Sequence, residues 1–292
     1  MAAHDHTLAV VLALVSTCGF GAGFVLTQFG LRWIPPRFGA AVSIPTSTLS
    51  FWCLAPFSVD PAEVELSAAS LFAMIGLLFP AAVTLLNFES NRLMGPNIAG
   101  AVGGLSPLFA VLLAVVMLGE HLRLLQIFGI IAIAGGVVLM YRGQWQAIAA
   151  RGLWLLALPL GASALRGFVQ PVIKLGLERW PNPIAAAVIG YTVSSAVLIL
   201  AAFVPSRPPG QGFDRRGALW FAAVGLCNGS AVLSMYAALG RGPVALVSPL
   251  IAAYPLVTLL LSFRFLKHER IDARLAAAVT MTVGGVALLL AT

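Results

Sequence analysis

Apolar residues fall into ten stretches along the chain, separated by short polar or Pro/Gly-rich breaks. Each stretch is close to the roughly 20 residues that an α-helix needs to cross a bilayer core of about 30 Å. The pattern therefore predicts an all-α membrane protein with ten transmembrane helices and little chain left for a soluble domain. The stretches lie at approximately 7–30, 37–57, 67–90, 97–118, 124–141, 152–176, 184–204, 216–239, 245–266 and 273–291.

The second half of the chain repeats the first. Gly-Pro, Pro, Glu and Gly-Gly positions recur in the same order at offsets between 147 and 149 residues, and Gly23-Phe24-Val25 recurs as Gly167-Phe168-Val169. Self-similarity of this kind indicates one structural unit present twice. The recurring positions are Gly95-Pro96 with Gly242-Pro243, Pro107 with Pro255, Glu120 with Glu269, and Gly135-Gly136 with Gly284-Gly285.

The number of helices in each unit decides how the two units are oriented. Five crossings are an odd number, so the second unit must enter the membrane from the opposite side. We therefore expect residues 1–143 and 144–292 to form two inverted five-helix repeats. Inverted repeats that meet at a pseudo-twofold axis near the midplane are a recurring design of alternating-access carriers.

Composition and charge support a membrane protein and argue against other classes. Hydrophobic residues make up 60% and charged residues 9% of the chain, against about 45–50% and 25% in soluble domains. The net charge of +7 comes from basic residues scattered singly, so no nucleic-acid partner is expected. Cys18, Cys53 and Cys227 are far apart and have no metal spacing. We expect no metal or other cofactor.

Several of the recurring residues resemble a known family. Tyr236-Ala237-Ala238-Leu239, Gly242-Pro243, Pro255, His268-Glu269 and Gly284-Gly285 resemble the second half of an EamA-type permease of the drug/metabolite transporter superfamily, and Pro107, Gly119-Glu120 and Gly135-Gly136 resemble its first half. The resemblance covers nearly the whole chain. It implies a ten-helix carrier with a central cavity lined mainly by helices 1, 3, 4, 6, 8 and 9.

Arg166 is a cation near the centre of the sixth predicted helix, where insertion scales assign an arginine a cost of about 2.5–3.5 kcal/mol. Gln170 and Lys174 follow at helical spacing, so the three side chains form one polar stripe that faces away from lipid. We identify Arg166 and Gln170 as substrate-binding candidates. The alternatives are a buried carbonyl or Glu89 as a structural partner of Arg166, and an interfacial position for Lys174.

Other polar residues lie near the middles of predicted helices. Ser106, Asn228 and Tyr254 are candidates for cavity lining, with interhelical hydrogen bonds as the alternative. Phe24 is a candidate pocket wall, with lipid or core contact as the alternative. Glu120, at the turn between helices 4 and 5, is expected to cap the amides of the following helix.

The third predicted helix ends in a polar segment. Asn87 shares one face with Thr84 and Asn91, whereas Glu89 and Arg92 lie off that face and can pair locally. In the repeat alignment Glu89 stands opposite Tyr236, which is where the first copy departs from the family pattern. Asn87, Glu89 and Tyr236 are therefore candidates for substrate specificity.

These observations favour a secondary transporter in the cell's inner or plasma membrane. Arg166 favours an anionic group on the substrate, and Glu89 would add a site for an amine or a proton, so the best candidate is an amino acid or similar zwitterion. The runner-up is an organic anion recognised by Arg166 alone. No nucleotide-binding motif suggests ATP, and proton coupling and facilitated diffusion are both open.

The sequence favours two other classes of function less. A membrane enzyme would need a nucleophile with a base or clustered metal ligands, and the chain contains no Gly-x-Ser-x-Gly, no His-Glu-x-x-His and no histidine inside a predicted helix. A membrane protein that packs or regulates without transport is the third class. Movement of labelled metabolites by purified protein in liposomes would separate a carrier from both.

The loop charges predict the orientation of the termini. Twelve Lys and Arg residues lie at the loops after odd-numbered helices and four at the opposite loops, so the positive-inside rule places both termini outside the cytoplasm. The family resemblance implies termini inside. A reporter fused at Thr292 decides between them: a reporter that is active only in the cytoplasm should stay silent, and its activity would contradict the charge rule.

Overall fold

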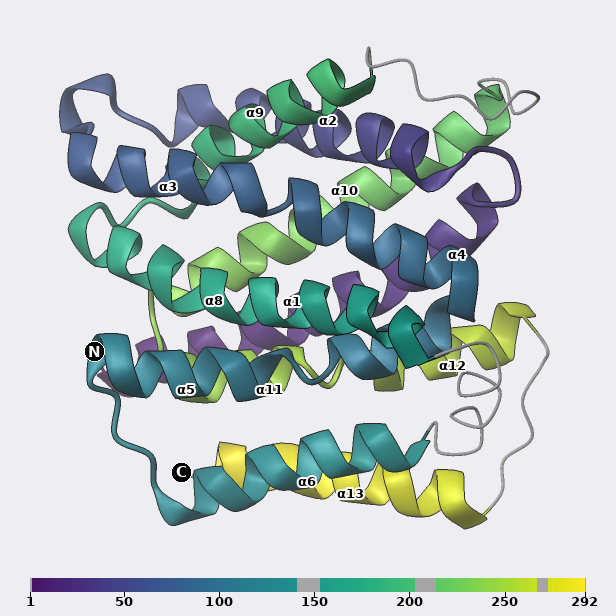
Figure 1. Cartoon of the computed structure of the whole chain (residues 1–292). Coiled ribbons are helices and arrows are strands. Elements are labelled where there is room, and N and C mark those ends of the chain that lie inside the picture. Colours follow the sequence, from purple (N-terminus) through teal and green to yellow (C-terminus); the bar gives the residue numbers. More distant parts are fainter. Residues whose placement is uncertain (1, 141–152, 203–213, 267–272, 292) are drawn as a thin grey trace.

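A computed structural model describes residues 2–140, 153–202, 214–266 and 273–291, and every regular element in these residues is a helix (Figure 1). Short 3₁₀ turns follow α2 and precede α8. The α-helices are α1 (Ala2–Gly30), α2 (Pro36–Leu54), α3 (Leu66–Leu78), α4 (Ala81–Gly103), α5 (Ser106–Leu118), α6 (Leu124–Met140), α8 (Ala157–Arg179), α9 (Pro183–Ala202), α10 (Arg215–Leu239), α11 (Val244–Ile251), α12 (Tyr254–Leu266) and α13 (Ala273–Leu290).

These helices account for ten membrane crossings. Within the described residues, seven helical segments are long and apolar enough to span a bilayer, and three shorter apolar helices accompany them. The spans include one over α3 and most of α4, and one over α11 and α12. The twelve described α-helices thus form ten crossings, and the expected all-α fold with ten transmembrane helices is confirmed.

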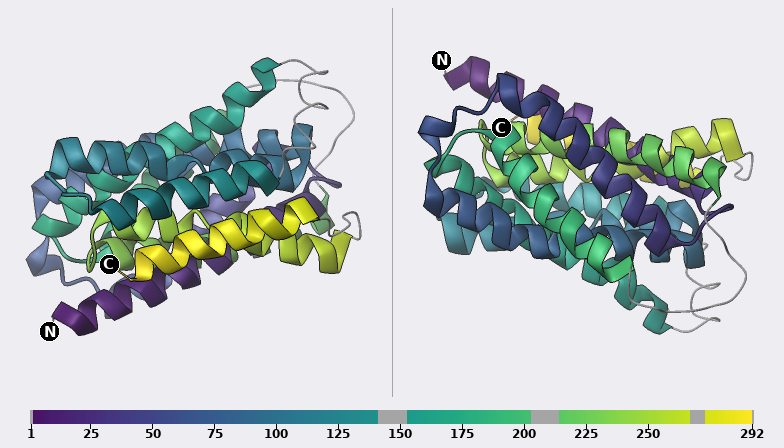
Figure 2. Two further views of the ribbon diagram at one scale, coloured as in Figure 1. Left: turned by 90° about the horizontal axis from the view of Figure 1, so that it is seen from below. Right: turned by 90° about the horizontal axis from the view of Figure 1, so that it is seen from above.

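The helices run roughly along one direction, and the ends of α1 and α13 that carry the termini lie at the same end of the bundle (Figures 1 and 2). The turns after α5, α8 and α10 lie at this end as well, which we call the terminal end. The chain therefore crosses the membrane an even number of times, five times in each half. Because five is odd, the second half starts at the end of the bundle opposite to the start of the first half. The two halves are thus inverted relative to one another.

Two helix pairs on opposite sides of the bundle join equivalent parts of the halves (Figure 1). Between α6 and α13, a side chain on Gly136 would meet the Ala278 carbonyl and one on Gly285 would meet the Gly129 carbonyl. Such small-residue contacts let helix backbones approach in lipid. Between α2 and α9, Thr48 and Ser195 share a 2.7 Å hydrogen bond although they are 147 residues apart. This spacing is the repeat offset, so the bond joins pseudo-equivalent residues.

The fourth and ninth crossings are both broken near their middles. Gly104 and Leu105 separate α4 from α5, and Ala252 and Ala253 separate α11 from α12. The second residue of the helix after each break is a proline, Pro107 in α5 and Pro255 in α12. The proline nitrogen carries no hydrogen, so it cannot bond to a carbonyl of the preceding helix. The breaks occupy equivalent places in the two repeats.

Hydroxyl groups from the opposite half bond to backbone carbonyls at these breaks. The Thr17 hydroxyl of α1 shares its proton between the Leu250 carbonyl at 3.0 Å and the Ala13 carbonyl of its own helix at 2.8 Å. The Ser163 hydroxyl of α8 does the same between the Val102 carbonyl at 2.7 Å and the Pro159 carbonyl at 2.8 Å. Each carbonyl also accepts a hydrogen bond from the amide three residues on, Leu250 from Ala253 at 3.2 Å and Val102 from Leu105 at 3.1 Å. The hydroxyl therefore adds a second hydrogen bond, which ties each half to the break in the other.

Close contacts of glycines on α1 and α8 show which residues of these two helices are equivalent in the two repeats. A Cβ on Gly21 would lie 2.9 Å from the Tyr254 carbonyl oxygen, and one on Gly167 would lie 2.8 Å from the Ser106 carbonyl oxygen. Gly167 is thus the structural equivalent of Gly21 and not of Gly23, the position that the Gly-Phe-Val match suggested. In this register Arg166 corresponds to Phe20.

The third crossing also departs from a straight helix. It breaks at Phe79-Pro80, between α3 and α4. At its far end Gly95 has a φ of 82° inside α4, a backbone conformation that favours glycine. The third crossing therefore ends at Gly95, and the rest of α4 begins the fourth.

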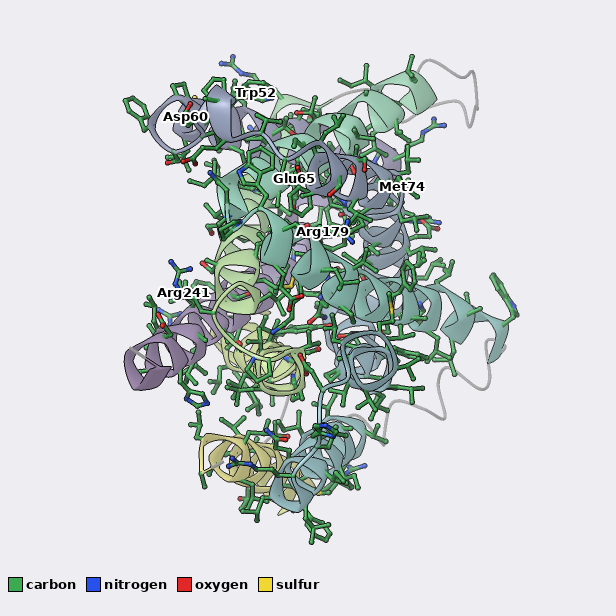
Figure 3. All side chains as sticks on the ribbon, turned by 90° about the vertical axis from the view of Figure 1, so that its left-hand side faces the viewer. Trp52, Asp60, Glu65, Met74, Arg179 and Arg241 are labelled. Atoms are coloured by element: carbon green, nitrogen blue, oxygen red, sulfur yellow. The ribbon has the colours of Figure 1, made fainter. Side chains whose placement is uncertain are left out.

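The outer surface is apolar. Large side chains such as Trp52, Met74, Leu112 and Val116 are more than half exposed, and Figure 3 shows Trp52 and Met74 on the periphery of the bundle. Exposed apolar area of this extent suits contact with lipid rather than water. The expected bilayer partner agrees with this surface.

Candidate functional site

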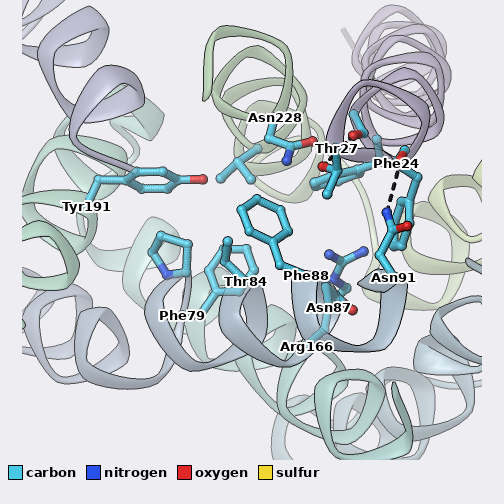
Figure 4. Close-up of a pocket in the computed structure, with 14 residues that line it drawn as sticks. Phe24, Thr27, Phe79, Thr84, Asn87, Phe88, Asn91, Arg166, Tyr191 and Asn228 are labelled. Atoms are coloured by element: carbon cyan, nitrogen blue, oxygen red, sulfur yellow. Dashed lines mark hydrogen bonds between the residues drawn. The ribbon is translucent and has the colours of Figure 1, made fainter. Parts of the chain in front are cut away.

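A pocket of about 440 Å³, part of it open to solvent, lies in the middle of the bundle (Figure 4). Its walls come from both halves of the chain. On α1 and α4 the lining residues lie in the parts of these helices that lead away from the terminal end. The pocket is lined by Phe20, Gly23, Phe24, Thr27, Phe79, Pro80, Thr84, Asn87, Phe88, Asn91, Arg166, Tyr191, Asn228 and Val232.

Arg166 supplies the positive charge of the pocket. Its side chain is buried, and its guanidinium carbon lies 4.7 Å from the centre of the Phe20 ring and 5.8 Å from that of Tyr254. In the described part of the chain no carboxylate forms an ion pair with Arg166, and its Nη1 has no hydrogen-bond partner. Ring faces attract a cation without occupying its donors. The guanidinium is therefore held in place with a donor left for another group.

Tyr254 stands behind this cation at the break in the ninth crossing. Its ring stacks on Phe24 at a centroid distance of 5.2 Å. The hydroxyl points at Gly103, where a Cβ would come within 2.0 Å of it, and it has no hydrogen-bond partner among the described residues. Tyr254 thus joins the broken crossing to the aromatic wall of the pocket.

Asn91 brings an acceptor to the same pocket. Its Nδ2 donates to the Phe24 carbonyl oxygen at 3.0 Å, which fixes the orientation of the amide because the reverse orientation would set two oxygens against each other. Asn91 is only 1% exposed, and no described residue bonds to its Oδ1. Figure 4 shows Asn91, Asn87 and Arg166 toward one end of the pocket and Tyr191 at the other.

The structure brings some of the residues proposed from the sequence together. Four of them line the pocket: Phe24, Asn87, Arg166 and Asn228. A Cβ on Gly23 would lie 2.0 Å from the Asn228 Oδ1, so this glycine makes room for the amide. These four residues come from α1, α4, α8 and α10.

The other candidates lie outside the lining. Four of them are buried in the helix packing: Gln170, Ser106, Tyr236 and Tyr254. Within the described part of the chain, the Oε1 of Gln170 has no partner. Glu89 pairs with Arg92 on a partly exposed face of α4. The local ion pair that the sequence offered as an alternative is therefore the arrangement seen for Glu89.

Several lining residues were not among the candidates. Tyr191 comes from α9, a helix that the family resemblance did not place at the cavity, and Phe79 and Pro80 come from the break between α3 and α4. Asn91 had a usable signal, because it shares a helix face with Asn87. Nothing in the sequence around Tyr191 distinguishes it from an interfacial tyrosine.

Comparisons with known proteins identify the family. A model described as "EamA-like transporter family" matches residues 7–142 and again residues 152–291. A solved structure described only as "Crystal structure of protein" shares the fold, with a TM-score of 0.71, 20% sequence identity, and coverage of 99% of this chain and 98% of that chain. No curated protein matches the chain.

The two family matches together cover nearly all of the chain. They confirm the resemblance that the repeated Gly-Pro and Gly-Gly positions suggested, and they place the function in membrane transport rather than enzymatic catalysis. The chain is a multi-pass membrane transporter made of two consecutive EamA domains, and it belongs to the EamA-like transporter family.

Proposed function

We propose that this transporter is a secondary carrier that moves a small organic acid across the cytoplasmic membrane by alternating access. The two repeats, residues 1–143 and 144–292, are the units that exchange conformations. Arg166 binds the carboxylate of the substrate in the central pocket. The side-chain oxygen of Asn91 accepts a hydrogen bond from a donor group near this carboxylate, such as the ammonium of an amino acid.

The guanidinium of Arg166, whose Nη1 has no partner among the described residues, carries this proposal. A buried cation without an anionic partner is unfavourable in an apolar medium, and ring faces compensate only part of the cost. The side chain of Arg166 lines the pocket. A planar guanidinium suits a carboxylate, which it can bind through two parallel hydrogen bonds.

Asn91 supports the second part of the proposal. Its unpartnered Oδ1 can accept a hydrogen bond from an ammonium or a hydroxyl group. This residue takes the role that the sequence suggested for Glu89, whose carboxylate is engaged by Arg92. An amino acid or a hydroxy acid therefore offers a partner to both Arg166 and Asn91.

A plain organic anion is the second candidate. None of the described lining residues is a carboxylate, so an ammonium group would meet only neutral oxygen atoms. The two candidates differ in one chemical group of the substrate, and a matched series of ligands separates them.

We expect binding to purified protein to require a carboxylate and to be strengthened by a neighbouring donor. The series consists of leucine and phenylalanine, each with its deaminated acid and its decarboxylated amine, in a thermal-shift or calorimetric titration. The amines should not bind, because they would place a second cation beside Arg166. The amino acids should bind about tenfold more tightly than the deaminated acids if Asn91 accepts one good hydrogen bond.

Equal affinity for amino acids and deaminated acids would leave the plain anion as the substrate class. Tighter binding of the amines than of the acids would contradict the role of Arg166. The variant Asn91→Leu provides the matched control, since it should remove the preference for the amino acid and keep the affinity for the deaminated acid.

A further inference from the structure

A carboxylate of the first repeat holds the start of a helix in the second. Glu120, in the turn between α5 and α6, accepts hydrogen bonds from the backbone amides of Val244 at 2.8 Å and Ala245 at 2.9 Å. These amides open α11, where the helix dipole favours a negative charge. Glu120 was expected to cap the following helix of its own repeat, but the structure places it on α11 instead.

Lys174 of α8 completes this contact. Its Nζ donates to the Gly242 carbonyl oxygen at 2.8 Å and lies 3.7 Å from the Oε1 of Glu120. Both charged side chains are largely buried, with 16% and 11% of their surfaces exposed. A buried, hydrogen-bonded ion pair is broken only at considerable cost, so the three segments are firmly joined at the terminal end.

The repeat register shows that the lysine of this contact has no lysine counterpart in the first repeat. The Gly21 and Gly167 contacts align α1 with α8 so that Gln28 is the counterpart of Lys174. A glutamine cannot supply the positive charge, and the Oε1 of Gln28 is buried without a hydrogen-bond partner among the described residues. Lys174 therefore belongs to the terminal end alone, because a glutamine stands at the equivalent position of the first repeat.

We propose that Glu120, Lys174 and the first turn of α11 form a latch that closes the carrier at its terminal end, and that opening toward this side requires their separation. The latch joins the repeats, since Glu120 belongs to the first and Lys174 and α11 belong to the second. It rests on the alternating access of the proposed function, but not on the identity of the substrate.

The surroundings of the latch fit this role. An open hollow of about 820 Å³ lies over it, lined in addition by Glu178 and Arg241 among others. Figure 3 looks onto this end, where Arg241 is labelled. Water therefore reaches the outer side of the latch, whereas the eight residues of α11 behind it are all buried.

Helix α11 also connects the latch to the central pocket. It starts at the amides held by Glu120 and ends at the Ala252-Ala253 break, after which Tyr254 stacks on Phe24. A short buried helix moves as one body. Release of its first turn would therefore change the packing behind the Arg166 side of the pocket.

The test is the accessibility of α11 from each side of the membrane. Ser248 is buried on α11, and its hydroxyl has no partner in the residues that the structure describes. Ser248→Cys is therefore a nearly isosteric probe in a background without the three native cysteines. The reagent is a charged, membrane-impermeant methanethiosulfonate added to vesicles of either orientation. The carriers compared are the parent, Glu120→Ala and Lys174→Gln, which takes the residue of the equivalent position.

We expect both substitutions to speed labelling from the terminal side by about tenfold or more, because each removes a charge-assisted hydrogen bond from the closed state. Glu178→Gln is the control, since it removes a carboxylate from the same hollow and should leave the labelling rate unchanged. Labelling within about twofold of the parent in Lys174→Gln would overturn the proposal. This variant decides the outcome even if Glu120→Ala fails to fold.

Discussion

Replacement of Arg166 by alanine is expected to weaken substrate binding by roughly 10- to 150-fold, which corresponds to the loss of about 1.5–3 kcal/mol from a charge-assisted hydrogen bond. The guanidinium is buried between the Phe20 and Tyr254 rings with its Nη1 unpartnered. Arg166→Lys should recover only part of the affinity, since an ammonium keeps the charge but not the planar fork. Calorimetric titration of the acid that binds best to the parent measures both changes.

Arg179→Ala is the control for this prediction. Arg179 lies at the end of the same helix and donates to Ser67 on an exposed face, so its loss should leave binding unchanged. The melting temperature of each variant shows whether the protein is folded. Folded Arg166→Ala and Arg166→Lys proteins that bind like the parent would make Arg166 a structural residue and would remove the argument for an anionic substrate.

Gly167→Ala is expected to destabilise the fold by about 1–3 kcal/mol, the usual range for overpacking. A Cβ at this position would lie 2.4 Å from the Phe109 Cβ and 2.8 Å from the Ser106 carbonyl oxygen. Relief requires α8 to move away from the start of α5, and this would strain the Ser163 hydrogen bond to Val102. A melting temperature several degrees below that of the parent is the expected result.

Gly161→Ala provides the matched control on the same helix. Its Cβ would have only Leu86 as a neighbour, at 3.8 Å, and alanine favours helix over glycine. This variant should be as stable as the parent or more so. Equal melting temperatures for Gly161→Ala and Gly167→Ala would show that α8 does not pack against the broken crossing as described.

The ten crossings and their duplication could be predicted because both are visible in a single sequence, without knowledge of contacts between distant residues. Apolar length sets the crossings, and the offset between Pro107 and Pro255 or between Glu120 and Glu269 sets the repeat. The shorter Gly-Phe-Val match was misleading. Three residues match easily by chance, and the register that places Gly167 opposite Gly21 is visible only in the contacts of both glycines.

The exchange of hydrogen bonds between the halves could not be predicted. Thr17 and Ser163 look like ordinary small residues in apolar helices, and their role follows from the carbonyls of Leu250 and Val102, which lie far away in the sequence. Glu120 had a reasonable local partner in the next helix. The structure shows α11 instead, because the pseudo-twofold axis brings the turns of opposite repeats together.

A site residue could be predicted from the sequence where a charge lies in an apolar helix. It was harder to predict where the choice depended on which face of a helix points into the pocket. Arg166 stood out because a cation in the middle of an apolar helix is costly. Glu89 and Asn91 are two residues apart on α4, so they point to different sides of the helix. The charge of Glu89 made it a candidate. The helix face that Asn91 shares with Asn87 was the better guide, because both asparagines line the pocket.

Counterflow in proteoliposomes tests most directly whether the protein is a secondary carrier with an acid site at Arg166. Vesicles containing purified protein are loaded with an unlabelled amino acid or organic acid and diluted into the same compound carrying a label. The parent should accumulate label transiently and saturably without ATP, and Arg166→Ala, if folded, should lose at least about nine-tenths of this uptake. Undiminished counterflow in Arg166→Ala, or none in the parent with any small acid, would contradict the account.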